Sequence, residues 1–216
     1  MAARLRILCV HGYRQNDQIF REKTGAFRKL VKAVVDFVFV SAPHVVPEPE
    51  NLARDARTQE RGWWFSRADH SYNATDAADI CLGYEESIEM LEAYFEKEGP
   101  FDGILSFSQG ASLVSLLAAE KLMDPTSKVK FRFAILVSGF KSALTAHQNA
   151  YATPIACPSL HIFGDSDSVI PVHLSVDLAE AFTSAYTFRH SGGHYVPASA
   201  ELKAILVNFL KPLTVY

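Results

Sequence analysis

The sequence predicts an α/β fold, in which a mostly parallel sheet carries helices on both faces. Short apolar runs that are typical of buried strands alternate with longer segments whose apolar residues recur at helical spacing. Parallel strands need crossover connections, and crossover helices cover both faces of the sheet. A chain of 216 residues without internal repeats is expected to form one domain, residues 1–216, with a substantial core.

The first predicted elements are a strand, a helix and a second strand. The apolar run at 5–10 ends at His11-Gly12 and predicts a buried strand that enters a loop. The segment 16–34 predicts a helix with one apolar face, which consists of Phe27, Leu30, Val31 and Val34. Residues 37–40 predict the next strand, which ends before Pro43.

A long irregular segment follows at about 44–76. It contains Pro47 and Pro49, a charged middle and no clear periodicity. Long loops in compact domains are often functional, so we interpret this segment as an excursion from the domain.

The rest of the chain returns to regular alternation. Tyr84, Ile88, Leu91 and Phe95 have helical spacing, and the acidic residues among them predict a solvated helix face. The remaining predicted elements are strands at 101–105, 131–137, 159–163 and 185–189, and helices at 111–122, 172–182 and 198–210.

Composition and charge argue against several classes of protein. The chain is 49% hydrophobic and 21% charged, which indicates a soluble globular protein, and its net charge of −3 gives no reason to expect nucleic acid as a partner. Three scattered cysteines predict neither disulfides nor a metal site, and they favour a reducing compartment. No apolar stretch is typical of a signal peptide or long enough to cross a bilayer. We therefore expect a cytoplasmic protein without stable membrane insertion.

The pentapeptide Ser106-Phe107-Ser108-Gln109-Gly110 indicates a nucleophile elbow. It follows an apolar strand and opens a helix, and small residues stand two positions before and after Ser108. Such a turn exposes the serine hydroxyl at the end of the sheet. It also places the serine at a helix N-terminus, where free N–H groups stabilise negative charge.

A serine nucleophile needs a base and an orienting acid, and both are expected in loops at the carboxyl ends of strands. One such loop offers Asp165 and Asp167, and spacing alone does not choose between them. Another loop offers His194, which is preferred over His190 because the preceding glycines allow close approach of the backbone. The order Ser108, Asp167, His194 is that of α/β-hydrolases.

The tetrahedral intermediate of an acyl transfer needs two N–H donors. One is expected from the backbone of Gln109, directly after the serine, and the other from the backbone of Tyr13 in the loop after the first strand. His11, beside that loop, is interpreted as a brace rather than as a catalytic residue. His161 lies in mid-strand and is expected to pack in the core or against a pocket.

Both tryptophans lie in the run Arg61-Gly62-Trp63-Trp64-Phe65, within the excursion. Three adjacent aromatic residues cannot all face the core from one strand. Two interpretations stay open: a hydrophobic plug that packs the loop down, or a wall of an acyl-binding pocket supplied by Trp64 or a neighbour.

Several of these motifs together resemble the family of small serine hydrolases first grouped in yeast. They are residues 11–16, 20–25, 61–65, 99–104, 107–111, 137–140, 164–171 and 191–194, so the likeness covers nearly the whole chain. The resemblance implies an α/β-hydrolase fold with a serine–aspartate–histidine triad. It also selects Asp167, three residues after the turn glycine, over Asp165. One departure is Ser106, where the family usually has glycine, and this serine is expected to strain or reshape the elbow.

The sequence thus predicts a serine esterase that works without a metal or other cofactor, with Ser108, Asp167 and His194 as catalytic residues. The resemblance implies carboxylic esters as substrates, with longer acyl chains favoured by some members. It also implies an alternative, because certain fungal relatives cleave thioesters: a thioesterase acting on acyl-CoA or acyl-carrier substrates. A hydrolase-fold binding protein without turnover would lack a triad member, and none is missing here.

Overall fold

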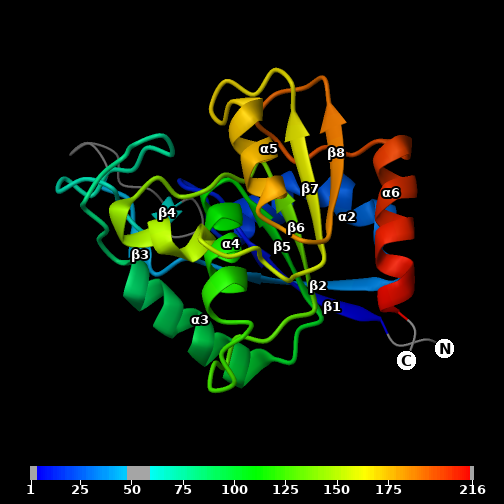
Figure 1. Ribbon diagram of the computed structural model, residues 1–216. Helices are drawn as coiled ribbons and strands as arrows, with labels where there is room; N and C mark the ends of the chain where they lie inside the picture. Colours follow the sequence, from blue (N-terminus) through cyan, green and yellow to red (C-terminus); the bar gives the residue numbers. More distant parts are fainter. Residues whose placement is uncertain (1–3, 48–58, 215–216) are drawn as a thin grey trace.

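A computed structural model describes residues 4–47 and 59–214 of the chain (Figure 1). Its main sheet has six parallel strands in the order β2-β1-β5-β6-β7-β8. The strands are β1 (Leu5–Val10), β2 (Val35–Val40), β5 (Gly103–Phe107), β6 (Phe133–Val137), β7 (Ser159–Gly164) and β8 (Ala185–His190). The predicted mostly parallel α/β sheet is therefore confirmed, whereas the single domain over 1–216 stays a prediction.

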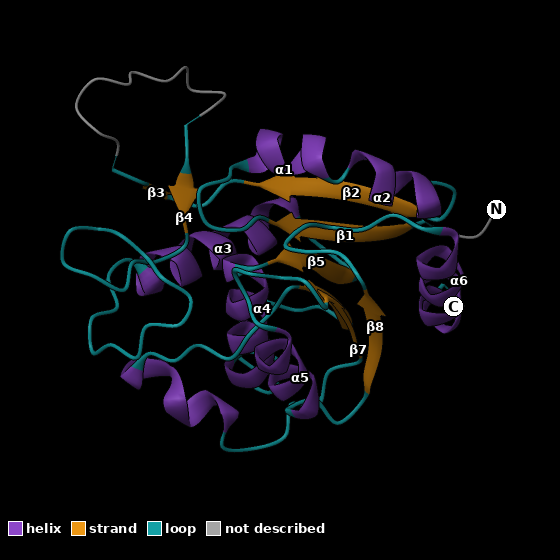
Figure 2. Cartoon of the chain, turned by 90° about the horizontal axis from the view of Figure 1, so that it is seen from above, coloured by secondary structure: helices purple, strands orange, loops and turns teal. Residues whose placement is uncertain are grey.

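Helices cover both faces of this sheet (Figure 2). On one face lie α1 (Asp17–Lys23), α2 (Gly25–Val31) and α6 (Ala200–Leu210), and on the other lie α3 (Tyr84–Glu98), α4 (Gln109–Glu120) and α5 (Val172–Glu180). Alternate residues of one strand point to opposite faces: Leu8 and Val10 of β1 join the core under α4, while Ile7 and Cys9 join the core under α6.

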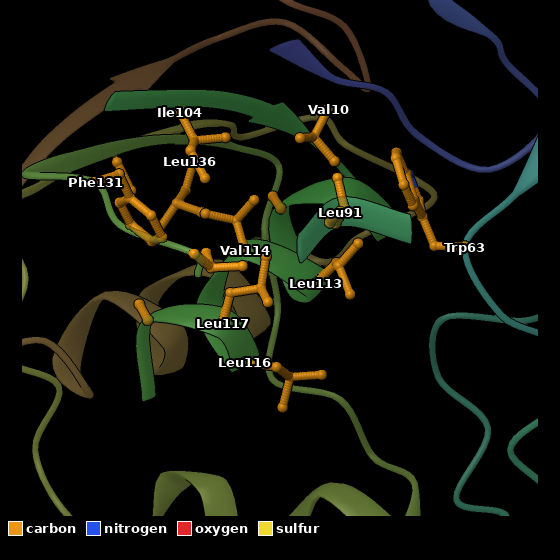
Figure 3. Packing of buried hydrophobic residues seen from close by; sticks show 14 of the residues in the cluster. Val10, Trp63, Leu91, Ile104, Leu113, Val114, Leu116, Leu117, Phe131 and Leu136 are labelled. Atoms are coloured by element: carbon orange, nitrogen blue, oxygen red, sulfur yellow. The ribbon is translucent and has the colours of Figure 1, made fainter. Parts of the chain in front are cut away.

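The core around α4 holds the first turn of that helix firmly against the sheet. Residues Gln109 to Ala118 of α4 are buried. Figure 3 shows Leu113, Val114 and Leu117 on the side of this helix toward Ile104 and Leu136 of the strands and Leu91 of α3, while Leu116 points away from the strands. Because a close-packed interior resists displacement, the residue that precedes α4 has a fixed position at the carboxyl edge of the sheet.

Several predicted boundaries differ from those of the structure, and local geometry or strand pairing explains three of them. The helix predicted at 16–34 is two helices, because the backbone of Thr24 leaves the helical conformation (φ −93°, ψ 6°) before Gly25 begins α2. The Thr24 hydroxyl donates to the Phe20 carbonyl at 2.7 Å, a bond that favours a bend. The second strand begins at Val35 rather than 37, and its pairing with Leu5 of β1 sets that start. The strand predicted at 101–105 is β5 at 103–107, because parallel pairing of Ile7 with Gly103 determines its register.

The excursion contains regular structure that periodicity does not predict. Strand β3 (His44–Val45) pairs antiparallel with β4 (Arg61–Gly62), and a 3₁₀ segment, η1 (Thr145–Tyr151), packs nearby against α4. Residues 48–58 of the predicted excursion lie outside the described residues.

A final 3₁₀ turn, η2 (Lys211–Leu213), follows α6. Among the helices that the structure describes, none combines the length and apolar character needed to cross a bilayer.

Three histidines are almost completely buried, and this predicts acid-induced unfolding. Burial lowers the pKa of His11 and of His147 to about 4 and the pKa of His161 to about 3. In the unfolded chain each imidazole has a pKa of about 6.5. Below that pH the three imidazoles bind protons in the unfolded state but stay neutral in the folded state. The stability that these groups contribute is therefore complete above pH 6.5 and is lost as the pH falls toward 4, at about 4 kcal/mol per pH unit.

The measurement is the urea midpoint of unfolding as a function of pH. We expect the midpoint to fall steeply between pH 6 and 4. In a His161→Gln variant, the slope of the free energy of unfolding against pH should correspond to the uptake of about one proton fewer. A midpoint that is flat over this range would show that these imidazoles protonate in the folded protein.

Candidate active site

Ser108 occupies a strained turn between β5 and α4. Its backbone has φ 52° and ψ −118°, a region that L-residues rarely adopt, and its N–H donates to the Val137 carbonyl at 2.9 Å. A side chain at position 110 would collide with the His11 and Val10 carbonyls, so glycine is required there. The elbow predicted from the sequence is thus present in the geometry.

Ser106, which stands where the resembled family usually has glycine, lies within strand β5. Its side chain is buried and its hydroxyl donates to the Ile135 carbonyl of β6 at 3.2 Å. The neighbouring strand thus supplies an acceptor for the polar group that this serine adds to the core.

Three side chains far apart in the sequence form one hydrogen-bonded chain. His194 Nε2 lies 3.1 Å from Ser108 Oγ, and His194 Nδ1 lies 2.7 Å from Asp167 Oδ2. They come from three loops at the carboxyl edge of the sheet: the β5–α4 turn, the β7–α5 loop and the β8–α6 loop (Figure 1). The structure therefore brings together the serine, histidine and aspartate that the sequence singled out.

The Asp167 carboxylate is held in its ionised form. Burial by itself raises the pKa of this carboxyl. Hydrogen bonds from the Ile170 N–H, the His194 ring and the Val169 N–H lower the pKa by more than burial raises it, so the net change is a decrease. An ionised carboxylate accepts a hydrogen bond from the N–H at His194 Nδ1, which keeps the proton on Nδ1 and leaves the lone pair of Nε2 toward the Ser108 hydroxyl. This is the tautomer that a general base for serine requires.

The two rival residues lie in other environments. Asp165 forms an ion pair with Arg189 on the surface, where both side chains are about half exposed. His190 is the last residue of β8, and its Nδ1 accepts the Gly192 N–H at 3.2 Å. Neither is hydrogen-bonded to His194 or Ser108 among the described residues, so of the two aspartates only Asp167 contacts the histidine beside Ser108.

The loop after β1 lies directly against the elbow. A Cβ atom at Gly12 would stand 2.9 Å from Phe107 Cδ1 and 3.2 Å from Ser108 Cβ. Within residues 4–47 and 59–214, the backbone N–H groups of Tyr13 and Gln109 have no hydrogen-bond acceptor. His11 is buried and bonds the backbone of Gly12 and Ala42 rather than Ser108.

A cavity of about 620 Å³ opens beside Ser108 and His194. Its apolar wall consists of Phe20, Phe107 and Val196, and the rest of its lining is Tyr13, Arg14, Gln15, Lys23, Glu60 and Tyr195. The patterns of the sequence do not indicate the apolar wall. Phe107 and Val196 could have been found because they lie close in the sequence to Ser108 and His194. Phe20, which reaches the cavity from α1, belongs to the motif at 20–25, but that motif by itself does not indicate a role in the cavity.

The interpretation of Trp64 as a wall of an acyl pocket is wrong for this cavity. Trp64 is fully buried, and its ring meets Tyr72, Tyr84 and His147 edge to face. It packs the excursion onto α3 and η1, and it does not line the space beside Ser108.

No group of three or more His, Cys, Asp or Glu side chains in the described part of the chain is arranged to hold a metal ion.

Solved structures with low sequence identity share this fold. Esterase PE8 aligns with a TM-score of 0.66 at 21% identity, over 98% of this chain and 94% of that one. Acyl-protein thioesterase 2 of Zea mays aligns with a TM-score of 0.61 at 16% identity, over 100% and 96%. The predicted α/β-hydrolase fold is confirmed.

Sequence comparison finds much nearer relatives. Esterase OVCA2 of Danio rerio is 50% identical over 224 residues, which cover 97% of this chain and 98% of that protein. Esterase OVCA2 of Homo sapiens is 42% identical, over 95% of each chain. The model of the family described as "Serine hydrolase (FSH1)" matches residues 1–205. The chain is therefore a member of the FSH1 family of serine hydrolases.

Proposed function

We propose that this serine hydrolase is an esterase that cleaves carboxylic esters with medium to long acyl chains through an acyl-enzyme. The observation that supports it most is the hydrogen-bonded chain Ser108–His194–Asp167 at the mouth of the cavity. His194 Nε2 takes the Ser108 proton while Oγ attacks the ester carbonyl carbon. The same imidazolium then gives that proton to the departing alcohol as the carbon–oxygen bond breaks.

Deacylation repeats these steps with water. His194 removes a proton from a water molecule, the hydroxide attacks the acyl carbon, and the bond to Ser108 Oγ breaks as His194 returns the proton. The Asp167 carboxylate stabilises the imidazolium in both halves of the reaction.

The negative oxygen of each tetrahedral intermediate would be bound by the backbone N–H groups of Tyr13 and Gln109. Both are without internal acceptors among the described residues, and Gln109 is the first residue of α4, whose dipole adds to the stabilisation. Each such donor contributes about 3 kcal/mol to the stability of the transition state.

The acyl chain would lie against Phe20, Phe107 and Val196. A cavity of about 620 Å³ is in the usual range for ligands much larger than an acetyl group. Each buried methylene contributes about 0.8 kcal/mol, so the cavity favours longer chains.

A series of p-nitrophenyl esters from acetate to dodecanoate tests this proposal. We expect kcat/KM to rise by about tenfold for every two methylenes until the cavity is filled. The acetate ester is the internal control for the triad. An acetate ester cleaved as fast as the octanoate would contradict the acyl-binding part of the proposal.

Thioesters of the same chain lengths separate the two reactions that one triad supports. We expect oxygen esters to be preferred, and a consistent preference for acyl-CoA or acyl-carrier thioesters would establish the alternative. The location stays a proposal as well: Cys9, Cys81 and Cys157 are free, as is usual in the reducing cytoplasm.

A further inference from the structure

We propose that Trp63 is a positioning residue that joins the two halves of the oxyanion hole. This inference rests on the proposed function, because it concerns the Tyr13 and Gln109 donors of that reaction. It assigns a role in the reaction to the run 61–65, which lies far from the triad in the sequence.

Trp63 contacts both donor segments through separate hydrogen bonds. Its indole Nε1–H donates to the His11 carbonyl in the loop after β1 at 2.8 Å. Its backbone N–H donates to Gln109 Oε1 in the first turn of α4 at 2.9 Å. The Gln109 side-chain amide also donates to the Trp64 carbonyl at 2.8 Å. The side chain of Gln109, the first residue of α4, therefore bonds the backbone of both tryptophans.

The imidazole of His11 completes the arrangement. The Ala42 N–H donates to His11 Nε2 at 2.9 Å, so the ring proton is on Nδ1, and that proton is donated to the Gly12 carbonyl at 2.8 Å. The His11 and Trp63 rings also contact each other, with centroids 5.1 Å apart.

These bonds fix two successive peptide planes. A peptide unit is planar and trans, so a bond to its carbonyl oxygen also fixes the direction of its N–H, on the opposite side. Trp63 fixes the unit that contains the His11 carbonyl, and His11 fixes the next unit, which carries the Tyr13 N–H. The direction of this donor therefore depends on two buried side chains.

Packing alone does not explain the arrangement, and the neighbouring residue shows why. Trp63 and Trp64 are both fully buried, but the indole N–H of Trp64 has no acceptor among the described residues. The chain thus offers a matched pair: replacement by phenylalanine removes similar volume at both positions but removes an oriented hydrogen bond only at 63.

The experiment compares Trp63→Phe with Trp64→Phe in the full chain. For Trp63→Phe we expect kcat on p-nitrophenyl octanoate to fall about tenfold with KM within twofold, since the donor is misdirected rather than deleted. An alkyl trifluoromethyl ketone, which forms an oxyanion on Ser108, should bind about tenfold more weakly. Trp64→Phe should lower the melting temperature to a similar extent, yet keep kcat and ketone affinity within threefold.

A second variant removes the N–H without changing the shape of the side chain. Benzothienylalanine at position 63 replaces the indole N–H by sulfur, so it tests the hydrogen bond even if Trp63→Phe fails to fold. We expect the same loss of kcat and of ketone affinity.

The outcomes separate this inference from the proposed function. Equal losses in the two phenylalanine variants, or unchanged ketone affinity in the benzothienylalanine protein, would overturn the role of Trp63. A wild-type protein that cleaves no ester would instead contradict the proposed function. The rate at which a fluorophosphonate labels Ser108, which needs no turnover, would then decide whether Trp63 orients the donors.

Discussion

Replacement of Ser108 by alanine is expected to reduce kcat for p-nitrophenyl octanoate by about 10⁶-fold. The variant loses the only hydroxyl that lies beside His194 Nε2 among the described residues, at 3.1 Å, so no acyl-enzyme can form. The strained backbone at this position tolerates alanine about as well as serine, since both carry a Cβ atom. We therefore expect the fold and the melting temperature to be retained. A fluorophosphonate probe should label the wild-type protein at Ser108 and should fail to label the variant.

Ser138 provides the matched control. It also follows a central strand, β6, with a positive φ of 47°, and it is fully buried. Its hydroxyl has no hydrogen-bond partner among the described residues, hence no base. Ser138→Ala should keep kcat within about threefold. Residual activity above 1% in Ser108→Ala, or probe labelling at another serine, would exclude the proposed nucleophile.

The elbow was predictable from the sequence because all the residues of its pattern are contiguous: an apolar strand, small residues on both sides of the serine, and an apolar helix. The reason for the glycine at position 110 is tertiary, since a side chain there would collide with the carbonyls of Val10 and His11. The end of β7 was predictable in the same way, because its apolar run stops at a turn glycine, Gly164.

The choice between Asp165 and Asp167 depends on tertiary contacts that spacing does not contain. Both lie in the same turn, and only the structure pairs the first with Arg189 at the surface and the second with His194. The family pattern also selects Asp167, because a pattern shared by folded proteins already reflects their tertiary contacts.

The excursion was the least predictable part of the chain. Strands of two residues, such as β3 and β4, have no periodicity to detect, and their position depends on the hydrogen bonds of Gln109 and Trp63. For the same reason the sequence could not tell which aromatic side chain of 63–65 would face which neighbour. The break at Thr24 was hidden because apolar residues continue at helical spacing across it.

Replacement of Asp167 by asparagine is expected to lower kcat by about 10⁴-fold at neutral pH, with little change in KM. The fold should survive, because the asparagine carbonyl oxygen can still accept the Val169 and Ile170 N–H groups that now bond the carboxylate. Its amide would then donate to His194 Nδ1. That bond favours the tautomer with the proton on Nε2, where no lone pair is left for the Ser108 proton.

Asp165→Asn is the control two residues away in the same loop. Its carboxylate pairs with Arg189 while both side chains are about half exposed, and exposed ion pairs contribute at most about 1 kcal/mol to stability. We expect kcat within twofold of the wild type and a melting temperature close to it. Because the two variants remove the same charge from the same turn, a shared electrostatic effect would reduce both activities equally. A loss confined to Asp167→Asn follows only if that carboxylate orients His194, and a larger loss in Asp165→Asn would assign the acid to the other residue.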